Sequence, residues 1–116
     1  MLLICHPSCT TCQKARDFLK AHRLAFTERD IRMDKPSQEE LRQWLALSGL
    51  PLKRFFNTSG ILYREMALSA RLPDLKEEEQ LALLATDGML VRRPILVDGQ
   101  TVLVGFNEKT WSGALL

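Results

Sequence analysis

The sequence predicts an α/β fold with a mixed β-sheet, and three observations support this. A short apolar run at Leu2–Cys5 is followed by a helical pattern and a second short strand. The middle of the chain carries helical patterns only, and the last third contains two apolar runs separated by a turn. A strand–helix–strand unit forms a right-handed parallel crossover, whereas a hairpin is antiparallel, so both pairings occur in one sheet.

The N-terminal elements follow from the spacing of apolar residues. The first strand is expected at residues 2–5, and His6-Pro7-Ser8 turns the chain. The next helix is predicted from the i, i+3, i+4, i+7 positions of Ala15, Phe18, Leu19 and His22. Residues 25–29 then form the second short strand.

The central region, residues 36–88, is predicted to be a helical insertion. Ser37 and Glu40 form a capping box that opens one helix, and Gly49 lies at its end. Short helices are expected on either side of a turn at residues 57–60. Asp74 with Glu77 resembles another capping box, which predicts a helix from there to Gly88.

The C-terminal third predicts a β-hairpin and a helix. Residues 94–97 and 101–104 are apolar runs joined by Asp98-Gly99-Gln100, which is a hairpin signal. Asn107 is expected to cap a last short helix that carries Trp111. The order is therefore β-α-β, several helices, then β-β-α, in a single domain over residues 1–116.

Composition narrows the class of protein. The chain has 116 residues, 46% of them apolar, which is enough for one globular core without disulfides. The net charge is only +2 and there is no long basic run, which argues against a nucleic-acid-binding surface. No apolar run is long enough to span a membrane. Three cysteines do not make a secreted disulfide framework, so we expect a cytoplasmic protein.

Cys9-Thr10-Thr11-Cys12 lies between the first strand and the first helix. Two thiols three positions apart on one helical turn are close enough to form a disulfide. Cys9 also faces the unpaired N–H groups and the positive end of the helix dipole, which favour thiolate over thiol. This placement is typical of a thioredoxin-like redox motif, with Cys9 as nucleophile and Cys12 as resolving thiol, although a pair of ordinary cysteines is the alternative.

Cys5 and His6 are not predicted to take part in the chemistry of the site. Cys5, at the end of an apolar strand, is typical of a small core residue. Zinc binding by these cysteines with His6 is disfavoured, because Cys5 and His6 are adjacent on a strand and point to opposite faces. No metal site is therefore predicted, and His6 is expected to lie exposed near the thiols.

Arg92-Arg93-Pro94 is the second constellation. From the residues alone, two interpretations are open: a solvated basic pair before a strand, or an arginine with a functional role. A proline at the first residue of a strand is permitted, because there it forfeits no essential ladder hydrogen bond.

Taken together, these pieces resemble the arsenate reductase-like (ArsC/Spx) family of bacterial thioredoxin-fold proteins. The resemblance covers nearly the whole chain. Its carriers are Pro7-Ser8-Cys9-Thr10-Thr11-Cys12-Gln13-Lys14-Ala15, Phe55-Phe56-Asn57-Thr58-Ser59-Gly60, Asp87-Gly88-Met89-Leu90, Arg92-Arg93-Pro94-Ile95 and Val104-Gly105-Phe106-Asn107-Glu108. It implies a thioredoxin-like sheet with a helical insertion, a cis peptide at Pro94 facing the Cys9 thiol, and Arg93 as the anion-contacting arginine.

Two departures from the family pattern bear on function. Glutaredoxin-coupled arsenate reductases use two further arginines, and those positions fall near Asn57 and Gly105 here. Losing two charge-assisted partners at about 1.5–3 kcal/mol each weakens the binding of a dianion by on the order of a hundredfold to ten-thousandfold. Those reductases also lack a cysteine at the Cys12 position, whereas the Cys9/Cys12 pair resembles the Spx/MgsR branch.

The resemblance implies three candidate functions. The first is a thiol-disulfide oxidoreductase that acts on a small thiol, disulfide or oxyanion substrate, with no bound cofactor and with glutathione, glutaredoxin or thioredoxin as electron donor. The second is a redox-switched regulator of the Spx/MgsR type that binds RNA polymerase. The third is glutaredoxin-coupled arsenate reduction, which we expect to be weak or absent because the two arginines are missing.

Overall fold

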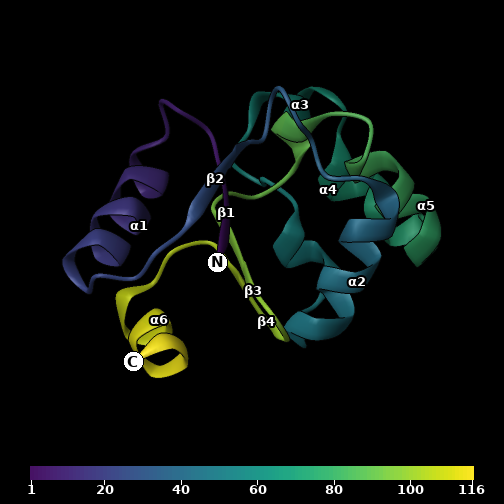
Figure 1. Cartoon of the computed structure of the whole chain (residues 1–116). Coiled ribbons are helices and arrows are strands. Elements are labelled where there is room, and N and C mark those ends of the chain that lie inside the picture. Colours follow the sequence, from purple (N-terminus) through teal and green to yellow (C-terminus); the bar gives the residue numbers. More distant parts are fainter.

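The structure, a computed structural model, describes every residue from 1 to 116 and is centred on a four-stranded sheet in the order β2-β1-β3-β4 (Figure 1). The strands are β1 (Leu2–Cys5), β2 (Thr27–Asp30), β3 (Ile95–Asp98) and β4 (Thr101–Val104). β1 pairs parallel with β2 and antiparallel with β3, and β3 pairs antiparallel with β4. The sheet is therefore mixed, as the sequence predicted.

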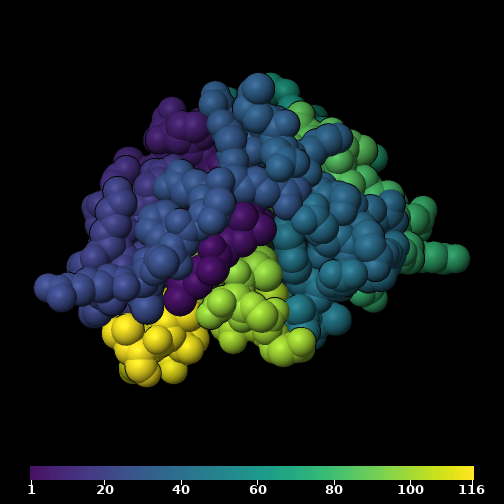
Figure 2. Space-filling model, in the orientation of Figure 1, coloured from purple at the N-terminus to yellow at the C-terminus, as the bar shows by residue number.

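Helices lie on both faces of the sheet (Figure 1). One face carries α1 (Thr10–Ala21) and α6 (Glu108–Leu115). The other face is covered by the segment between β2 and β3, which contains α2 (Gln38–Ser48), η1 (Leu52–Phe55), α3 (Ile61–Glu65), α4 (Leu68–Arg71), η2 (Leu72–Asp74), α5 (Glu77–Leu84) and η3 (Gly88–Leu90). On the face of the molecule shown in Figure 2, the hairpin residues reach the surface between the C-terminal helix and α2.

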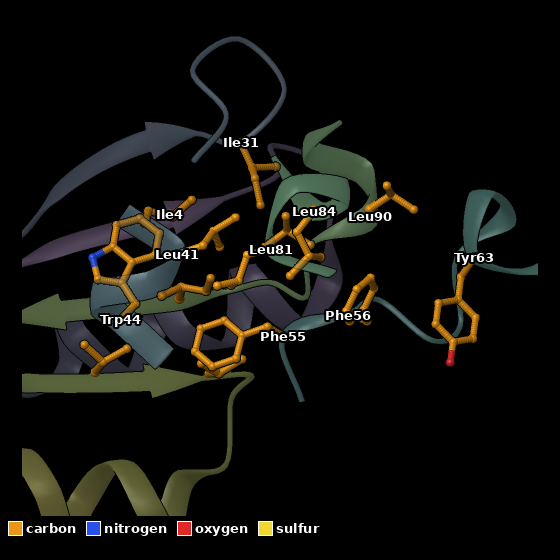
Figure 3. Packing of buried hydrophobic residues seen from close by; sticks show 14 of the residues in the cluster. Ile4, Ile31, Leu41, Trp44, Phe55, Phe56, Tyr63, Leu81, Leu84 and Leu90 are labelled. Carbon is orange, nitrogen blue, oxygen red and sulfur yellow. The ribbon is translucent and has the colours of Figure 1, made fainter. Parts of the chain in front are cut away.

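The alternation of side chains along β1 produces two separate cores. Leu3 and Cys5 are buried against α1 and α6, whereas Ile4 is buried against the helices of the opposite face. The larger core contains Leu41 and Trp44 from α2 and reaches α5 (Figure 3). Because β1 is buried on both faces, it reads as a continuous apolar run rather than an alternating one.

Local capping signals in the sequence were confirmed in two helices and wrong in one. Ser37 and Glu40 form the reciprocal capping box of α2, and Asn107 caps α6 by accepting from the Thr110 N–H. The box expected at Asp74 is wrong, because Pro73 opens the 3₁₀-helix η2 that contains Asp74. Helix α5 begins later, where the Lys76 N–H donates to the Glu79 carboxylate at 2.9 Å.

Element boundaries differ from expectation at the second strand, which runs over Thr27–Asp30 rather than residues 25–29. Its register is fixed by the parallel pairing of Leu2 with Thr27 and of Cys5 with Asp30. None of the helices combines the length and the apolarity needed to cross a membrane.

Gly88, at the start of η3, holds the insertion against the end of β2. A Cβ atom on Gly88 would lie 2.0 Å from the Ile31 carbonyl oxygen, so the two backbones touch directly. We expect Gly88→Ala to lower the free energy of unfolding by about 1–3 kcal/mol, the usual cost of overpacking. Gly113→Ala is the matched control: its Cβ would meet open space in α6, so stability should hold or rise. Equal urea midpoints for the two variants would contradict this close contact.

Candidate active site

The register of the sheet brings three loop segments to one edge. β1 ends at Cys5, β3 begins at Ile95 and β4 ends at Val104, and Ile95 pairs with both Ile4 and Val104. The Gly105 N–H donates to the Pro94 carbonyl at 2.8 Å, which extends this pairing by one step. The β1–α1 loop, the segment before β3 and the loop after β4 therefore meet at the same end of the sheet.

Cys9 occupies the N-cap position of α1. Its backbone is extended, with φ −80° and ψ 123°, and its carbonyl accepts from the Gln13 N–H at 3.0 Å. The side chain makes no capping hydrogen bond, although the residue stands where Ser or Asp would usually accept one. The half-buried Cys9 thiol thus remains available beside the N–H groups at the start of α1.

Cys12 lies at the centre of a cluster of three thiols. Its sulfur accepts from the His6 N–H at 3.4 Å, and interactions with the Cys5 and Cys9 thiols lower the pKa of Cys12. Cys5 on β1 and Cys12 on α1 are both buried in the core between the sheet and α1, and all three cysteines are reduced. The structure therefore brings together the two predicted redox thiols and adds Cys5, which the sequence assigned to the core alone.

The Cys5 thiol sets the ionisation of Cys12. Its hydrogen bond is the largest influence and lowers the pKa of Cys12 to about 6, with further help from the His6 N–H and against the opposing effect of burial. The same hydrogen bond, with burial, raises the pKa of Cys5 well above its ordinary value. Cys5 thus holds its proton and Cys12 is the thiolate of the pair at neutral pH.

Arg16 and His6 hold the β1–α1 loop in place. Arg16 is only 8% exposed, pairs with Glu28 and donates to the His6 carbonyl at 3.3 Å, and its charge also favours the Cys12 thiolate. The His6 ring accepts from the Ser8 N–H at 3.0 Å. Partial desolvation, with the nearby charge of Arg93, lowers the pKa of His6, so the ring is neutral at pH 7.

The Arg93–Pro94 peptide bond is cis, as the resemblance predicted. Pro94 is buried, and its carbonyl is bonded to Gly105 across the loop. Arg93 is half-buried beside the Met89 sulfur, 3.9 Å from the guanidinium. Arg93 and Cys9 line the same cavity, so the structure brings this predicted pair to one site.

A cleft of about 720 Å³ opens at this edge of the sheet, lined by 17 residues that include Cys9 and Thr11 from the start of α1. Asn57 and Gly105, the positions where the family's further arginines were expected, both line it. The lining also contains Arg54 and Arg92, neither of which was predicted as a site residue from the sequence.

A solvated basic pair was one of the two alternatives left open for Arg92 and Arg93, and the structure does not place Arg92 in solvent. The side chain is half-buried, with its Nε completely covered, and its Cδ would lie 3.7 Å from a Cβ placed on Gly105. Gly105 has a φ of +72°, which an arginine would resist, and the guanidinium of Arg92 covers it instead. Arg92 directly follows the long-range bridge between Phe56 and Val91, a pairing that no local sequence signal reveals, and its side chain lines the cleft.

The structure contains no group of three side chains positioned to hold a metal ion.

The profile of the ArsC family matches residues 5–114, nearly the whole chain. The chain belongs to the ArsC family. Among its family relatives, the protein YusI of Bacillus subtilis (strain 168) is 50% identical over 103 residues, covering 89% of this chain and 87% of YusI. Regulatory protein MgsR of the same organism is 34% identical, covering 88% of this chain and 79% of MgsR.

The fold agrees with that of solved ArsC-family structures. An ArsC family related protein from Bacteroides fragilis superimposes with a TM-score of 0.94 at 51% identity, over 97% of this chain and 94% of that one. The thioredoxin-like fold inferred from the sequence is thereby confirmed.

Proposed function

We propose that the protein is a thiol-disulfide oxidoreductase in which Cys9 is the nucleophile and Cys12 the resolving thiol. The observation that carries the proposal is the placement of a half-exposed Cys9, which lines the cleft, beside a buried Cys12 whose pKa is lowered. A nucleophile must be reached by substrate, and a resolving thiol must be ionised and adjacent to it. The two cysteines divide these requirements between them.

The reaction is a pair of thiol-disulfide exchanges. The Cys9 thiolate attacks one sulfur of a disulfide, the S–S bond breaks, and one substrate thiolate leaves and takes up a proton. The Cys12 thiolate then attacks the Cys9 sulfur of the mixed disulfide and releases the second substrate thiol. The substrate disulfide gains two electrons and the protein becomes a Cys9–Cys12 disulfide. A dithiol or two monothiols, such as glutathione or a thioredoxin-type protein, must return those electrons.

The direct test is to map the disulfide. Reduced protein is treated with limiting glutathione disulfide, alkylated in denaturant and digested for mass spectrometry. We expect one dominant disulfide between Cys9 and Cys12, with Cys5 alkylated only after unfolding, because Cys5 is 2% exposed and holds its proton. A dominant Cys5–Cys12 disulfide would overturn the assignment of roles.

A redox-switched regulator is the second candidate, and the 34% identity to MgsR is the observation that favours it. The enzyme and the regulator would undergo the same first oxidation of Cys9 and Cys12. They differ only in how fast the disulfide is reduced again and in whether the protein binds RNA polymerase. Repeated turnover of glutathione disulfide with a glutathione–glutaredoxin or thioredoxin system supports the enzyme. A single oxidation with slow re-reduction, together with stoichiometric binding of purified RNA polymerase, supports the regulator.

A further inference from the structure

The cleft beside Cys9 carries positive charge that the protein itself does not neutralise. Its lining contains Arg54, Arg92 and Arg93 but no Asp, Glu or Lys. Salt bridges occupy other arginines of the chain, namely Arg16, Arg29, Arg32 and Arg42, and none involves the three in the cleft. An arginine cluster without carboxylates is the arrangement expected of a site that receives an anion from outside.

Arg92 is the best positioned of the three. Its main chain is fixed by the bond from its N–H to the Phe55 carbonyl at 2.8 Å, and its stem packs over Gly105. Its guanidinium has only one weak partner, the Thr58 hydroxyl at 3.4 Å, and the buried Nε has no acceptor. A half-buried guanidinium held in one place with most of its donors free is preorganised for a carboxylate or phosphate.

The size and walls of the cleft argue for an organic anion. A volume of about 720 Å³ is that of a small-molecule site and greatly exceeds what one inorganic oxyanion fills. The lining mixes polar and apolar residues, and Phe106 is a partly buried aromatic side chain among them. The Trp111 indole N–H donates to the Gly105 carbonyl at 3.0 Å, so it is not free to bind a ligand.

We propose that the cleft is a binding site for small organic disulfides that carry carboxylates, with Arg92 and Arg54 holding a carboxylate while the disulfide reaches Cys9. This inference rests on the proposed function, which requires only that Cys9 attack some disulfide. It adds the substrate class and names two residues for recognition. Arg92 is the main contact because it is fixed and partly desolvated, and Arg54 is exposed and therefore contributes less.

The test compares two probe disulfides of similar length and opposite charge. 3,3′-Dithiodipropionate carries two carboxylates, and cystamine carries two ammonium groups. Binding is measured by calorimetry on the Cys9→Ser protein, which cannot exchange through position 9, so this part of the experiment needs no chemistry at that residue. We expect the dicarboxylate to bind at least about tenfold more tightly than cystamine at low salt, and the difference to shrink as salt rises.

Arginine variants locate the site. On the Cys9→Ser background, Arg92→Gln should weaken dithiodipropionate binding by about tenfold or more, and Arg54→Gln by about threefold. Arg64→Gln is the matched control, because Arg64 is exposed, forms no salt bridge and lies outside the cleft lining; it should leave binding unchanged.

The outcomes separate this inference from the proposed function. Equal binding of the two probes, or equal losses for Arg92→Gln and Arg64→Gln, would overturn the inference even if the wild-type protein reduces both disulfides. Preferential binding of the dicarboxylate without any reaction at Cys9 in the wild-type protein would support the site and overturn the proposed oxidoreductase.

Discussion

The Cys9→Ser variant should form no mixed disulfide with glutathione disulfide, whereas Cys12→Ser should accumulate one. Serine lacks the thiolate chemistry of the first step, so turnover in Cys9→Ser should fall by on the order of a thousandfold or more. In Cys12→Ser the first step still occurs, but nothing resolves the adduct. Intact-mass spectrometry should therefore detect a stable glutathione adduct in Cys12→Ser and unmodified protein in Cys9→Ser.

Loss of activity in Cys9→Ser cannot come from loss of the helix. The Cys9 side chain makes no cap bond in the wild type, and serine is a favoured N-cap residue, so thermal stability should hold or rise. If Cys9→Ser still cleared glutathione disulfide at the wild-type rate, the nucleophile would have to be another thiol, and the roles assigned here would be wrong.

The second large effect is expected at Cys5, which touches no substrate. Cys5→Ala removes the hydrogen bond that contributes most to lowering the pKa of Cys12, and that pKa should rise from about 6 by about one unit or more. Because the Cys12 thiolate is the attacking species, closure of the internal disulfide increases with pH through this pKa. At a pH near 6, closure should therefore slow about five- to tenfold in Cys5→Ala, while above about pH 9 the two proteins should match.

Closure is measured by rapid acid quenching, as the rate at which the glutathione mass leaves Cys9. Cys5→Ser keeps a hydrogen-bond donor and should retain most of the wild-type pH profile, which a merely structural role of Cys5 would not explain. A profile for Cys5→Ala that coincides with the wild type across the whole pH range would show that Cys5 does not control Cys12.

The parts of the fold that could be predicted were those encoded locally. The apolar run of β1, the capping box at Ser37 and the hairpin turn at Gly99 depend on neighbours a few residues apart, and the structure confirmed each. The predicted start of α5 was wrong, because two local patterns competed. Pro73 places Asp74 in the 3₁₀-helix η2, and the Glu79 carboxylate instead accepts from the Lys76 N–H at the start of α5.

Only those site residues that belong to a recognisable sequence motif could be predicted. The pair Cys9 and Cys12, and the cis bond at Pro94, came from spacing and from the family resemblance. The contact of Cys5 with Cys12 joins a strand to a helix across the core, so no spacing rule could reveal it. The same holds for Arg54 and Arg92, which reach the cleft through the path of the insertion and the Phe56–Val91 bridge.

The order of the strands has a consequence for synthesis of the chain. β1, which leads into the thiols, is completed by β3, which comes about ninety residues later, at Ile95. Domains are made from the N-terminus onward, so a nascent chain exposes its cysteines well before Arg92, Arg93 and Pro94 have emerged. Until then the cleft lacks the wall formed by residues 92–111, and Cys9 lacks the neighbouring charges of Arg92 and Arg93. The cleft beside Cys9 is therefore completed only with the last quarter of the polypeptide.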